Sequence, residues 1–244
     1  LWLAGVKIRI GPATKLAQIF INKKLKQKRS QSKKPEYEYN LDLIRHFIKS
    51  NGDIPIQTPE PPFLTFNKSE IHILKKKTLD NYSISKGTKL VFIHPGTGGS
   101  AINLSVDQYA ELALCISAEN DIYIVITAGP GELAIAEIIS NLLKGTKHHI
   151  HYSDSGIIDF CKFISICDVF ISGSTGPLHI AGALNKRTVA FYPSKKSATS
   201  LRWQTINSNH HQLAFTLGDG NHQHLSVIDL ELVCQIIKTD TLKI

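Results

Sequence analysis

The sequence predicts an α/β protein whose main element is a parallel sheet. From Lys89 onward, short apolar stretches alternate with segments of helical periodicity. That alternation is typical of right-handed βαβ units, in which each helix returns the chain to the next parallel strand. The stretch 51–66 carries four prolines and an Asn-Gly pair, which predicts a linker. We therefore expect an N-terminal domain with its linker over residues 1–66 and a C-terminal domain over residues 67–244.

The individual elements follow from the apolar pattern, taken in chain order. Before the linker, the pattern predicts a strand at 7–10 and helices at 13–26 and 39–49. After the linker, strands are expected at 89–94, 122–127, 148–152, 168–172 and 188–192. Helices are expected between them at 105–118, 132–143, 157–165 and 177–184, and a last amphipathic helix at 227–237.

The composition predicts a cytoplasmic protein. The longest apolar runs, such as 122–126, are far too short to cross a bilayer, and no signal peptide is visible. The four cysteines show no CxxC spacing, and we expect them to be reduced, mostly buried thiols. The absence of methionine, even at position 1, predicts an incomplete or unusually started chain.

The net charge of +8 is concentrated in two segments. The first, without an acidic residue, holds Lys23, Lys24, Lys26, Lys28, Arg29, Lys33 and Lys34, and the second holds Lys75, Lys76 and Lys77. Two interpretations stay open: solvated helix faces, or attraction to anionic lipid headgroups at about 1 kcal/mol per basic residue. Because the first segment lacks interleaved aromatic residues and no nucleic-acid-binding signature is present, we expect no nucleic-acid partner.

The most informative motif lies at 167–184 and reads CDVFISGSTGPLHIAGAL. A predicted strand runs into a Ser-Gly-Ser-Thr-Gly-Pro turn, and a helix of small residues bearing His179 follows. A hydroxyl residue ahead of Pro177 suits a helix N-cap, and the free N–H groups of the first turn form an anion site. Taken alone, the motif fits a packed turn as well as it fits an anion site.

A second loop of the same kind favours the anion site. The strand at 89–93 opens into His94-Pro95-Gly96-Thr97-Gly98-Gly99-Ser100-Ala101, and a capping-box pattern from Ser105 to Gln108 predicts the next helix start. Glycines allow backbone N–H groups to converge on phosphate oxygens, and Thr97 and Ser100 add hydroxyl donors. The loop lacks the Gly-Lys-Ser/Thr of a Walker A motif. Together, the two loops predict a diphosphate held between two helix N-termini.

The pair HPGTGGSAxN…YAEL and STGPLHIAGAL resembles glycosyltransferase family 9, the lipopolysaccharide heptosyltransferases. The resemblance covers roughly residues 90–192. It implies a GT-B fold, with a Rossmann-like C-terminal domain on a parallel sheet and a truncated Rossmann-like N-terminal domain. It also implies that the C-terminal domain holds most of the nucleotide-sugar, typically ADP-heptose.

The resemblance also assigns individual residues to the donor. Those expected to line the diphosphate and the sugar are Thr97, Gly98, Gly99 and Ser100 on one side, and Ser174, Thr175, Gly176 and His179 on the other. Glu132 is expected to face the nucleoside, and Ser155 to lie near the base. The family's general base lies near the start of the N-terminal domain, so its position in this chain is unknown.

Three positions depart from the family pattern. Ile102 and Leu104 stand where the family usually has a Lys or Arg followed by a Trp, and Ser174 stands where it usually has an Asp. Loss of the cation removes a charge-assisted contact, about twice as strong as a neutral hydrogen bond.

The expected reaction is an inverting transfer of heptose from ADP-heptose to a lipopolysaccharide core acceptor. No metal or cofactor is expected, because helix N-termini, Thr97, Thr175 and His179 would stabilise the departing diphosphate. The segment Lys23-Lys34 is expected to contact the inner face of the inner membrane. The alternative is a remnant that binds a nucleotide-sugar without catalysis.

A weaker alternative is an NAD-dependent oxidoreductase. Gly129-Pro130-Gly131-Glu132-Leu133-Ala134 formally matches G-x-G-x-x-A, and Asp154 lies about twenty residues further on. However, Pro130 removes one backbone donor that a pyrophosphate would use.

Clustered histidines raise a metal site as a further possibility. The two groups are His148, His149 and His151, and His222 and His224. Neither has zinc-type spacing with a complete ligand set, so we expect surface histidines and no metal.

Overall fold

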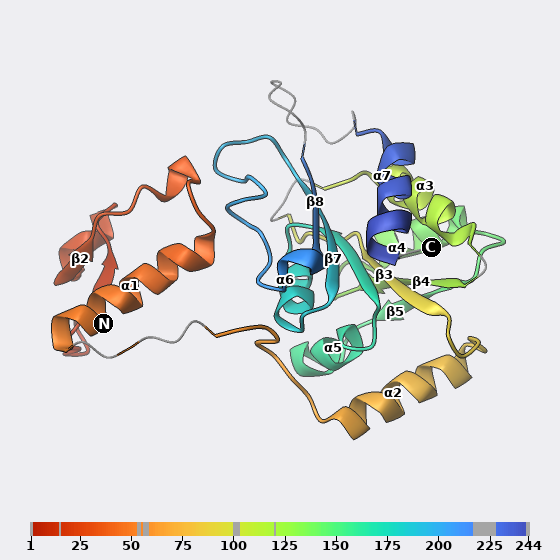
Figure 1. Ribbon diagram of the computed structural model, residues 1–244, viewed down its shortest axis with the longest axis horizontal. Coiled ribbons are helices and arrows are strands. Elements are labelled where there is room, and N and C mark those ends of the chain that lie inside the picture. Colours follow the sequence, from red (N-terminus) through yellow and green to blue (C-terminus); the bar gives the residue numbers. More distant parts are fainter. Residues whose placement is uncertain are drawn as a thin grey trace. The chain divides into compact units, whose positions relative to one another are not determined.

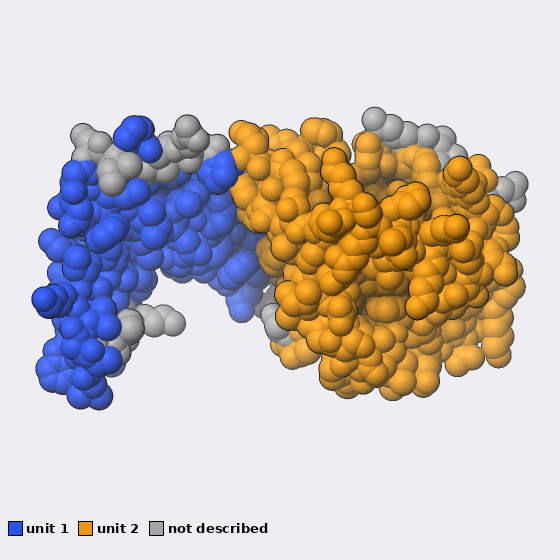
Figure 2. All heavy atoms as spheres, turned by 90° about the horizontal axis from the view of Figure 1, so that it is seen from below, with its two compact units in different colours: residues 1–59, 195–204 blue, residues 60–194, 205–244 orange. Residues whose placement is uncertain are grey.

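The computed structural model describes residues 2–14, 16–52, 55, 59–99, 103–119, 121–216 and 228–242. The chain forms two compact units (Figure 2). Unit 1 comprises Leu1–Pro59 and Lys195–Gln204, and unit 2 comprises Glu60–Ser194 and Thr205–Ile244. The expected division into domains at residue 66 stays a prediction, and each unit is described by itself below.

Unit 2 is built on a six-stranded parallel sheet, which confirms the predicted α/β class. The strands are β3 (Lys89–His94), β4 (Ile122–Ala128), β5 (His148–Tyr152), β6 (Val169–Gly173), β7 (Arg187–Tyr192) and β8 (Gln212–Thr216). Their order across the sheet is β5-β4-β3-β6-β7-β8, and every neighbouring pair is parallel. The first five lie within one residue of the predicted strands at each end, whereas β8 was not predicted.

The helices of unit 2 connect and cover these strands. They are α2 (Lys68–Asn81), α3 (Val106–Ser117), α4 (Leu133–Leu142), α5 (Ile157–Ile164), α6 (Gly176–Ala183) and α7 (Leu230–Ile236), with a π-helical segment at Ile237–Leu242 and a 3₁₀ turn at Asn209–His211. The four helices predicted between strands are confirmed to within one residue at each end. The last helix was predicted from 227, which lies outside the described residues; α7 begins after the N-cap Asp229.

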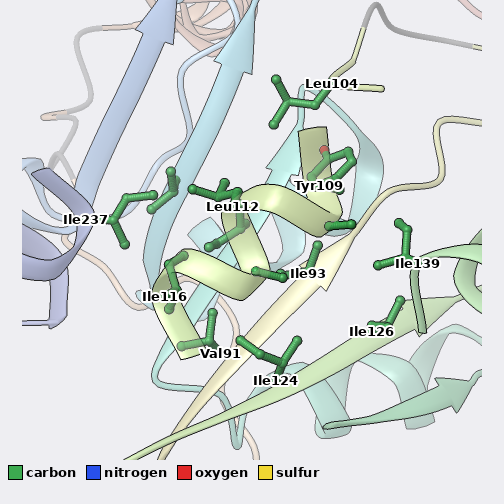
Figure 3. Close-up of a cluster of buried hydrophobic side chains, with 14 of the residues drawn as sticks. Val91, Ile93, Leu104, Tyr109, Leu112, Ile116, Ile124, Ile126, Ile139 and Ile237 are labelled. Atoms are coloured by element: carbon green, nitrogen blue, oxygen red, sulfur yellow. The ribbon is translucent and has the colours of Figure 1, made fainter. Parts of the chain in front are cut away.

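Helices cover both faces of the sheet (Figure 1). On one face, Leu112 and Ile116 of α3 pack with Val91 and Ile124 of the strands (Figure 3). On the other face, the ring of Phe92 stacks on that of Phe163 in α5, with centroids 4.9 Å apart. Burial on both faces explains why β3, β4 and β6 read as continuous apolar runs.

Helix α2 was not predicted, although its lysines were noted. Asn67 is its N-cap, and the Asn67 side chain accepts hydrogen bonds from the N–H groups of Ser69 and Glu70. Glu70 pairs with Lys162 of α5 at 2.6 Å. Because most residues of α2 are polar, the apolar periodicity that would predict a helix is weak. The N-cap and the packing against the rest of unit 2 determine the position of the helix.

Unit 1 contains a two-stranded parallel sheet, β1 (Ile10–Pro12) and β2 (Lys23–Leu25), and the helix α1 (Glu36–Asn51), with 3₁₀ turns at Leu16–Phe20 and Arg29–Gln31. The helix predicted at 39–49 is confirmed. The strand predicted at 7–10 overlaps β1 only at Ile10, and the helix predicted at 13–26 is wrong. Asn22 donates to the Lys7 carbonyl at 2.6 Å and accepts from the Arg9 N–H at 2.9 Å, which turns the chain back beside β1.

Two of the four cysteines form a disulfide, which corrects the expectation that all are reduced. Cys115 of α3 is bonded to Cys234 of α7, with Cα atoms 6.3 Å apart. The two helices pack side by side, so cysteines 119 residues apart meet. Cys161 and Cys167 are free and buried, and burial raises the pKa of Cys167 to about 12, so this thiol stays protonated.

The expectation that the histidines of β5 lie on the surface is also wrong. His149 is buried, and its ring stacks on Tyr82 with centroids 3.5 Å apart. Neither of its ring nitrogens has a hydrogen-bond partner among the residues that the structure describes. His151 stacks on Phe163 at 3.4 Å and is half-buried. The predicted alternation along the strand is present, but α2 and α5 cover the face to which both rings point. His222 and His224 lie outside the described residues.

None of the helices in the described ranges is both long and apolar enough to span a membrane.

Burial of His149 and His151 predicts that acid destabilises the protein. Burial lowers the pKa of each from its ordinary 6.5 to about 4. Between these values the unfolded chain binds protons that the folded protein does not. The free energy of unfolding therefore falls as the pH falls, by up to about 1.4 kcal/mol per pH unit for each histidine. Urea unfolding at pH 7, 6 and 5 measures this slope.

The variant His149→Phe keeps a ring for the stack on Tyr82 and cannot be protonated, so the slope should become shallower. His210→Asn, at an exposed position, is the control and should keep the original slope. An unchanged slope in His149→Phe would contradict the assignment.

Candidate functional site

The candidate site lies where the path of the chain across the sheet reverses. From β3 the chain proceeds to β4 and β5, then returns to the other side of β3 and continues through β6, β7 and β8. The loops that follow β3 and β6 therefore begin side by side at the carboxyl edge, since Ile93 pairs with Ile171 and His94 with Ser172. Open α/β sheets bind ligands in the crevice at such a switch point.

The loop after β3 carries the first group of predicted residues. Gly98 and Gly99 have φ angles of +52° and +75°, which side chains rarely allow. The Thr97 hydroxyl oxygen accepts a hydrogen bond from the Gly99 N–H at 3.1 Å, closing a compact turn. Ser100 and Ile102 lie outside the described residues, so the role predicted for Ser100 and the effect of Ile102 stay predictions.

The Glu132 carboxylate connects the loops that follow β3 and β4. It accepts the Gly129 N–H at 2.9 Å and lies 3.6 Å from Nε2 of the buried His94. A Cβ on Gly96 would lie 2.1 Å from this carboxylate, so a side chain there would displace it. Burial lowers the pKa of His94 despite the nearby negative charge, so the imidazole stays neutral. Glu132 keeps further lone pairs for hydroxyl groups of a ligand.

A buried serine connects the loops after β3 and β6. The Ser172 hydroxyl donates to the His94 carbonyl at 3.0 Å, and its oxygen lies 3.0 Å from the Thr175 hydroxyl. The Ser172 hydroxyl has a single proton, which it donates to the His94 carbonyl. The Thr175 hydroxyl is therefore the donor in the contact between the two side chains. Thr175 is the N-cap residue of α6 and is 4% exposed. Its hydroxyl therefore fixes the start of α6.

The first turn of α6 leaves main-chain donors available. The His179 N–H bonds to the Thr175 carbonyl at 3.3 Å, Pro177 has no N–H, and the N–H groups of Gly176 and Leu178 precede the intrahelical ladder. These amides lie at the positive end of the helix dipole. His179 is half-buried in the same turn, and burial lowers the pKa of its imidazole, which keeps the ring neutral.

Asn103 is a structural residue of the site that sequence reasoning did not single out. Its amide donates to the Pro95 carbonyl at 2.9 Å, and its oxygen accepts from the Leu104 N–H at 3.0 Å and from the Tyr109 hydroxyl. A Cβ on Gly173 would lie 2.6 Å from the same oxygen. Asn103 therefore fixes the loop after β3 against the end of β6. Asn103 is the last residue of the HPGTGGSAxN motif, but the sequence analysis assigned it no role.

Ser155, expected near the base, lies after β5, two strands from β3. Its hydroxyl donates to Asp154 at 3.1 Å, and it lines a cavity of about 560 Å³ together with Ile73, His151 and Phe163. The structure thus brings Thr97, Gly98, Gly99, Glu132 and the start of α6 to neighbouring strand ends and leaves Ser155 at the outer strand.

Within the described ranges, no group of three or more His, Cys, Asp or Glu side chains is placed to hold a metal ion.

Sequence comparison assigns the chain to a family. Residues 1–225 match glycosyltransferase family 9 (heptosyltransferase). The chain belongs to glycosyltransferase family 9. It is 41% identical over 232 residues to a Haemophilus influenzae protein named "Putative glycosyltransferase", a match that covers 95% of this chain and 66% of that protein.

Two further relatives extend the comparison. Lipooligosaccharide heptosyltransferase 2 of Campylobacter jejuni is 28% identical over 128 residues, which are 51% of this chain and 40% of that enzyme. The fold is similar to that of E. coli ADP-heptose lipopolysaccharide heptosyltransferase II, with a TM-score of 0.71, 18% identity, and coverage of 98% of this chain and 71% of that one. The matches thus cover 66% of the length of the Haemophilus influenzae protein and 40% of that of the Campylobacter jejuni enzyme.

Membership of family 9 confirms the resemblance carried by the two loops, together with the GT-B-type α/β fold. It removes the support for an NAD-dependent oxidoreductase. The local structure agrees, because the Glu132 carboxylate occupies the Gly129 N–H that a pyrophosphate would use in that fingerprint.

The close approach at Gly173 predicts that Gly173→Ala destabilises unit 2. The added methyl group must displace Asn103, whose three hydrogen bonds resist movement, at a cost of about 1–3 kcal/mol. Gly176→Ala is the matched control, because nothing lies within 4 Å of its added Cβ. Urea unfolding compares the two variants. Equal stabilities would show that Asn103 does not fix the loop against β6.

Proposed function

We propose that this family 9 glycosyltransferase binds a nucleoside-diphosphate sugar at the switch point and transfers the sugar to a lipopolysaccharide acceptor. The observation that supports it is the junction of the β3 and β6 loops, which Ser172 and Asn103 hold together beside the start of α6. ADP-heptose is the proposed donor, because it is named for the E. coli enzyme of similar fold. A phosphorylated lipid core is the proposed acceptor.

The diphosphate is proposed to lie between the loop after β3 and the first turn of α6. The N–H groups of Gly176 and Leu178 face it with the positive end of the helix dipole. His179, kept neutral by burial, supplies one ring N–H. Thr97, Gly98, Gly99 and Ser100 are the proposed contacts from the other loop, and Ser174 and Thr175 complete the turn.

Glu132 is proposed to accept a hydrogen bond from a ribose hydroxyl. Its carboxylate is held by the Gly129 N–H and remains partly exposed. A fixed carboxylate beside a strand end is the usual partner of a ribose diol in α/β nucleotide sites. Ser155 keeps its proposed place near the base.

In the proposed reaction the acceptor oxygen attacks the anomeric carbon as the bond from that carbon to the phosphate oxygen breaks, with inversion. Negative charge develops on the diphosphate, and prepositioned N–H donors stabilise it without reorganisation. The acceptor proton passes to a carboxylate base. No residue of this chain is assigned that role.

The segment Lys23-Lys34 is proposed to contact the anionic surface of the inner membrane. The exposed lysines of the segment are Lys23, Lys24, Lys26, Lys28 and Lys33, and none of them forms an ion pair with another residue in the described ranges. The other two cations of the segment are neutralised, because Arg29 pairs with Glu36 and Lys34 with Asp42. Five exposed charges contribute about 5 kcal/mol to attraction at an anionic surface.

A thermal-shift panel tests the donor class. ADP-, UDP- and GDP-sugars are compared with NAD on the same protein. We expect the ADP-sugar to raise the unfolding temperature most, because binding to the folded state alone stabilises it. A shift with NAD and none with any nucleotide-sugar would contradict the proposal.

His179→Ala should weaken binding of ADP-heptose about tenfold, the loss of one hydrogen bond to a charged group. Titration calorimetry measures the affinity, and circular dichroism checks that the fold is retained. His210→Ala, an exposed histidine outside the site, is the control. An affinity equal to that of the unsubstituted protein would remove His179 from the phosphate site.

A further inference from the structure

A cavity of about 790 Å³ lies at the amino ends of β3 and β6, at the edge of the sheet opposite the donor site. It is formed by α2, the loop 82–88 and the starts of the two strands. Strand β3 has six residues, which separate the two edges by about 16 Å. The cavity is therefore distinct from the proposed donor site.

Cations predominate in its lining. Four lysines, Lys75, Lys76, Lys86 and Lys89, face two carboxylates, Asp80 and Asp168, and His72 lies among them. His72, Lys76 and Asp80 are four residues apart along α2, so they lie on one face of the helix. The concentration of ammonium groups in a concave surface favours an anionic ligand.

Two of the lysines already have structural partners. Lys75 lies 3.6 Å from one oxygen of Asp168, whose other oxygen accepts the Leu90 N–H at 2.8 Å. Lys89 donates to the carbonyl of Leu242 at the end of the last helix. These contacts connect α2 and the C-terminal helix to the sheet, and they account for two of the four positive charges.

The other two lysines of the cavity, Lys76 and Lys86, have no structural partner among the described residues. Lys76 and Lys86 are exposed, and neither forms an ion pair or a hydrogen bond with a residue that the structure describes. They approach the cavity from α2 and from the loop before β3, so one ligand could contact both. Thr88 adds a hydroxyl to the lining.

Part of the cavity lining is apolar. Leu79 and the buried Ile84 belong to it, and the volume of the cavity exceeds that of an inorganic phosphate. We propose that this cavity binds a phosphate group carried on a larger organic molecule, with Lys76 and Lys86 contacting the phosphate and the apolar part of the lining contacting its organic part. A phosphate with several oxygens and up to two negative charges suits separate ammonium donors.

Titration calorimetry with inorganic pyrophosphate tests the proposal on the full chain. The donor site is first saturated with ADP, so that pyrophosphate reports the second site. The variant Lys76→Gln with Lys86→Gln should bind pyrophosphate at least about tenfold more weakly. The control, Lys144→Gln with Lys147→Gln, carries the same charge change at exposed positions outside the cavity and should bind it as the unsubstituted protein does.

The ADP titration itself keeps this proposal separate from the proposed function. All three proteins should bind ADP equally. Equal pyrophosphate binding by the three proteins, or none by any, would overturn the cavity proposal. A third outcome is that the protein does not bind ADP but binds pyrophosphate, and that this binding is weakened in the Lys76 and Lys86 variant. That outcome would support the cavity proposal and contradict the proposed donor site.

Flotation with vesicles distinguishes a lipid headgroup from a free phosphate compound. Vesicles of phosphatidylglycerol are compared with vesicles of phosphatidylcholine. Binding to the first that is lost in the Lys76 and Lys86 variant and competed by pyrophosphate identifies a lipid phosphate. Vesicle binding unaffected by that variant, with cavity-dependent pyrophosphate binding, identifies a free phosphorylated compound. Both outcomes support the cavity as a phosphate site.

Discussion

The arrangement of the candidate site depends on the direct pairing of β3 with β6. These strands are 75 residues apart from the end of the first to the start of the second, yet His94 and Ser172 are partners in the sheet. The buried Ser172 hydroxyl uses this adjacency, since it contacts the carbonyl that ends β3 and the hydroxyl that begins α6. One side chain thereby fixes the geometry of both loops.

Burial around this junction determines the charge of the site. His94 and His179 are kept neutral because the surrounding protein disfavours the charged imidazole. The proposed binding of a diphosphate therefore relies on main-chain N–H groups and the helix dipole. Such donors do not depend on pH, and they are held rigidly by the fold. The lysines gather instead at the opposite edge of the sheet and in unit 1.

Most of the sheet could be predicted from the sequence because its signals are local. The apolar runs of β3 and β4 and the Ser105–Gln108 capping box each lie within a few residues, and all appear in the structure. The predictions failed for features that depend on contacts between residues distant in the sequence. The Cys115–Cys234 bond requires α3 and α7 to pack together, and the burial of His149 requires the unpredicted α2.

The same limit applied within the site. The glycine- and hydroxyl-rich loops identified the family, but the sequence could not show that Asn103 closes against Gly173. Nor could the sequence show that the Thr175 hydroxyl donates to Ser172, because this direction follows from the hydrogen bond that Ser172 donates to the His94 carbonyl in the folded chain. The residues proposed to contact a ligand could therefore be selected from the sequence, whereas the residues that hold the two loops together could not.

A crystal structure of this chain with ADP would test the central claim most directly. The account predicts density for the diphosphate between the loop after β3 and the first turn of α6, within hydrogen-bond distance of the Gly176 and Leu178 N–H groups. It also predicts that the Ser172 contact to the His94 carbonyl is retained. A diphosphate bound elsewhere on the chain, with these N–H groups facing only solvent, would contradict it.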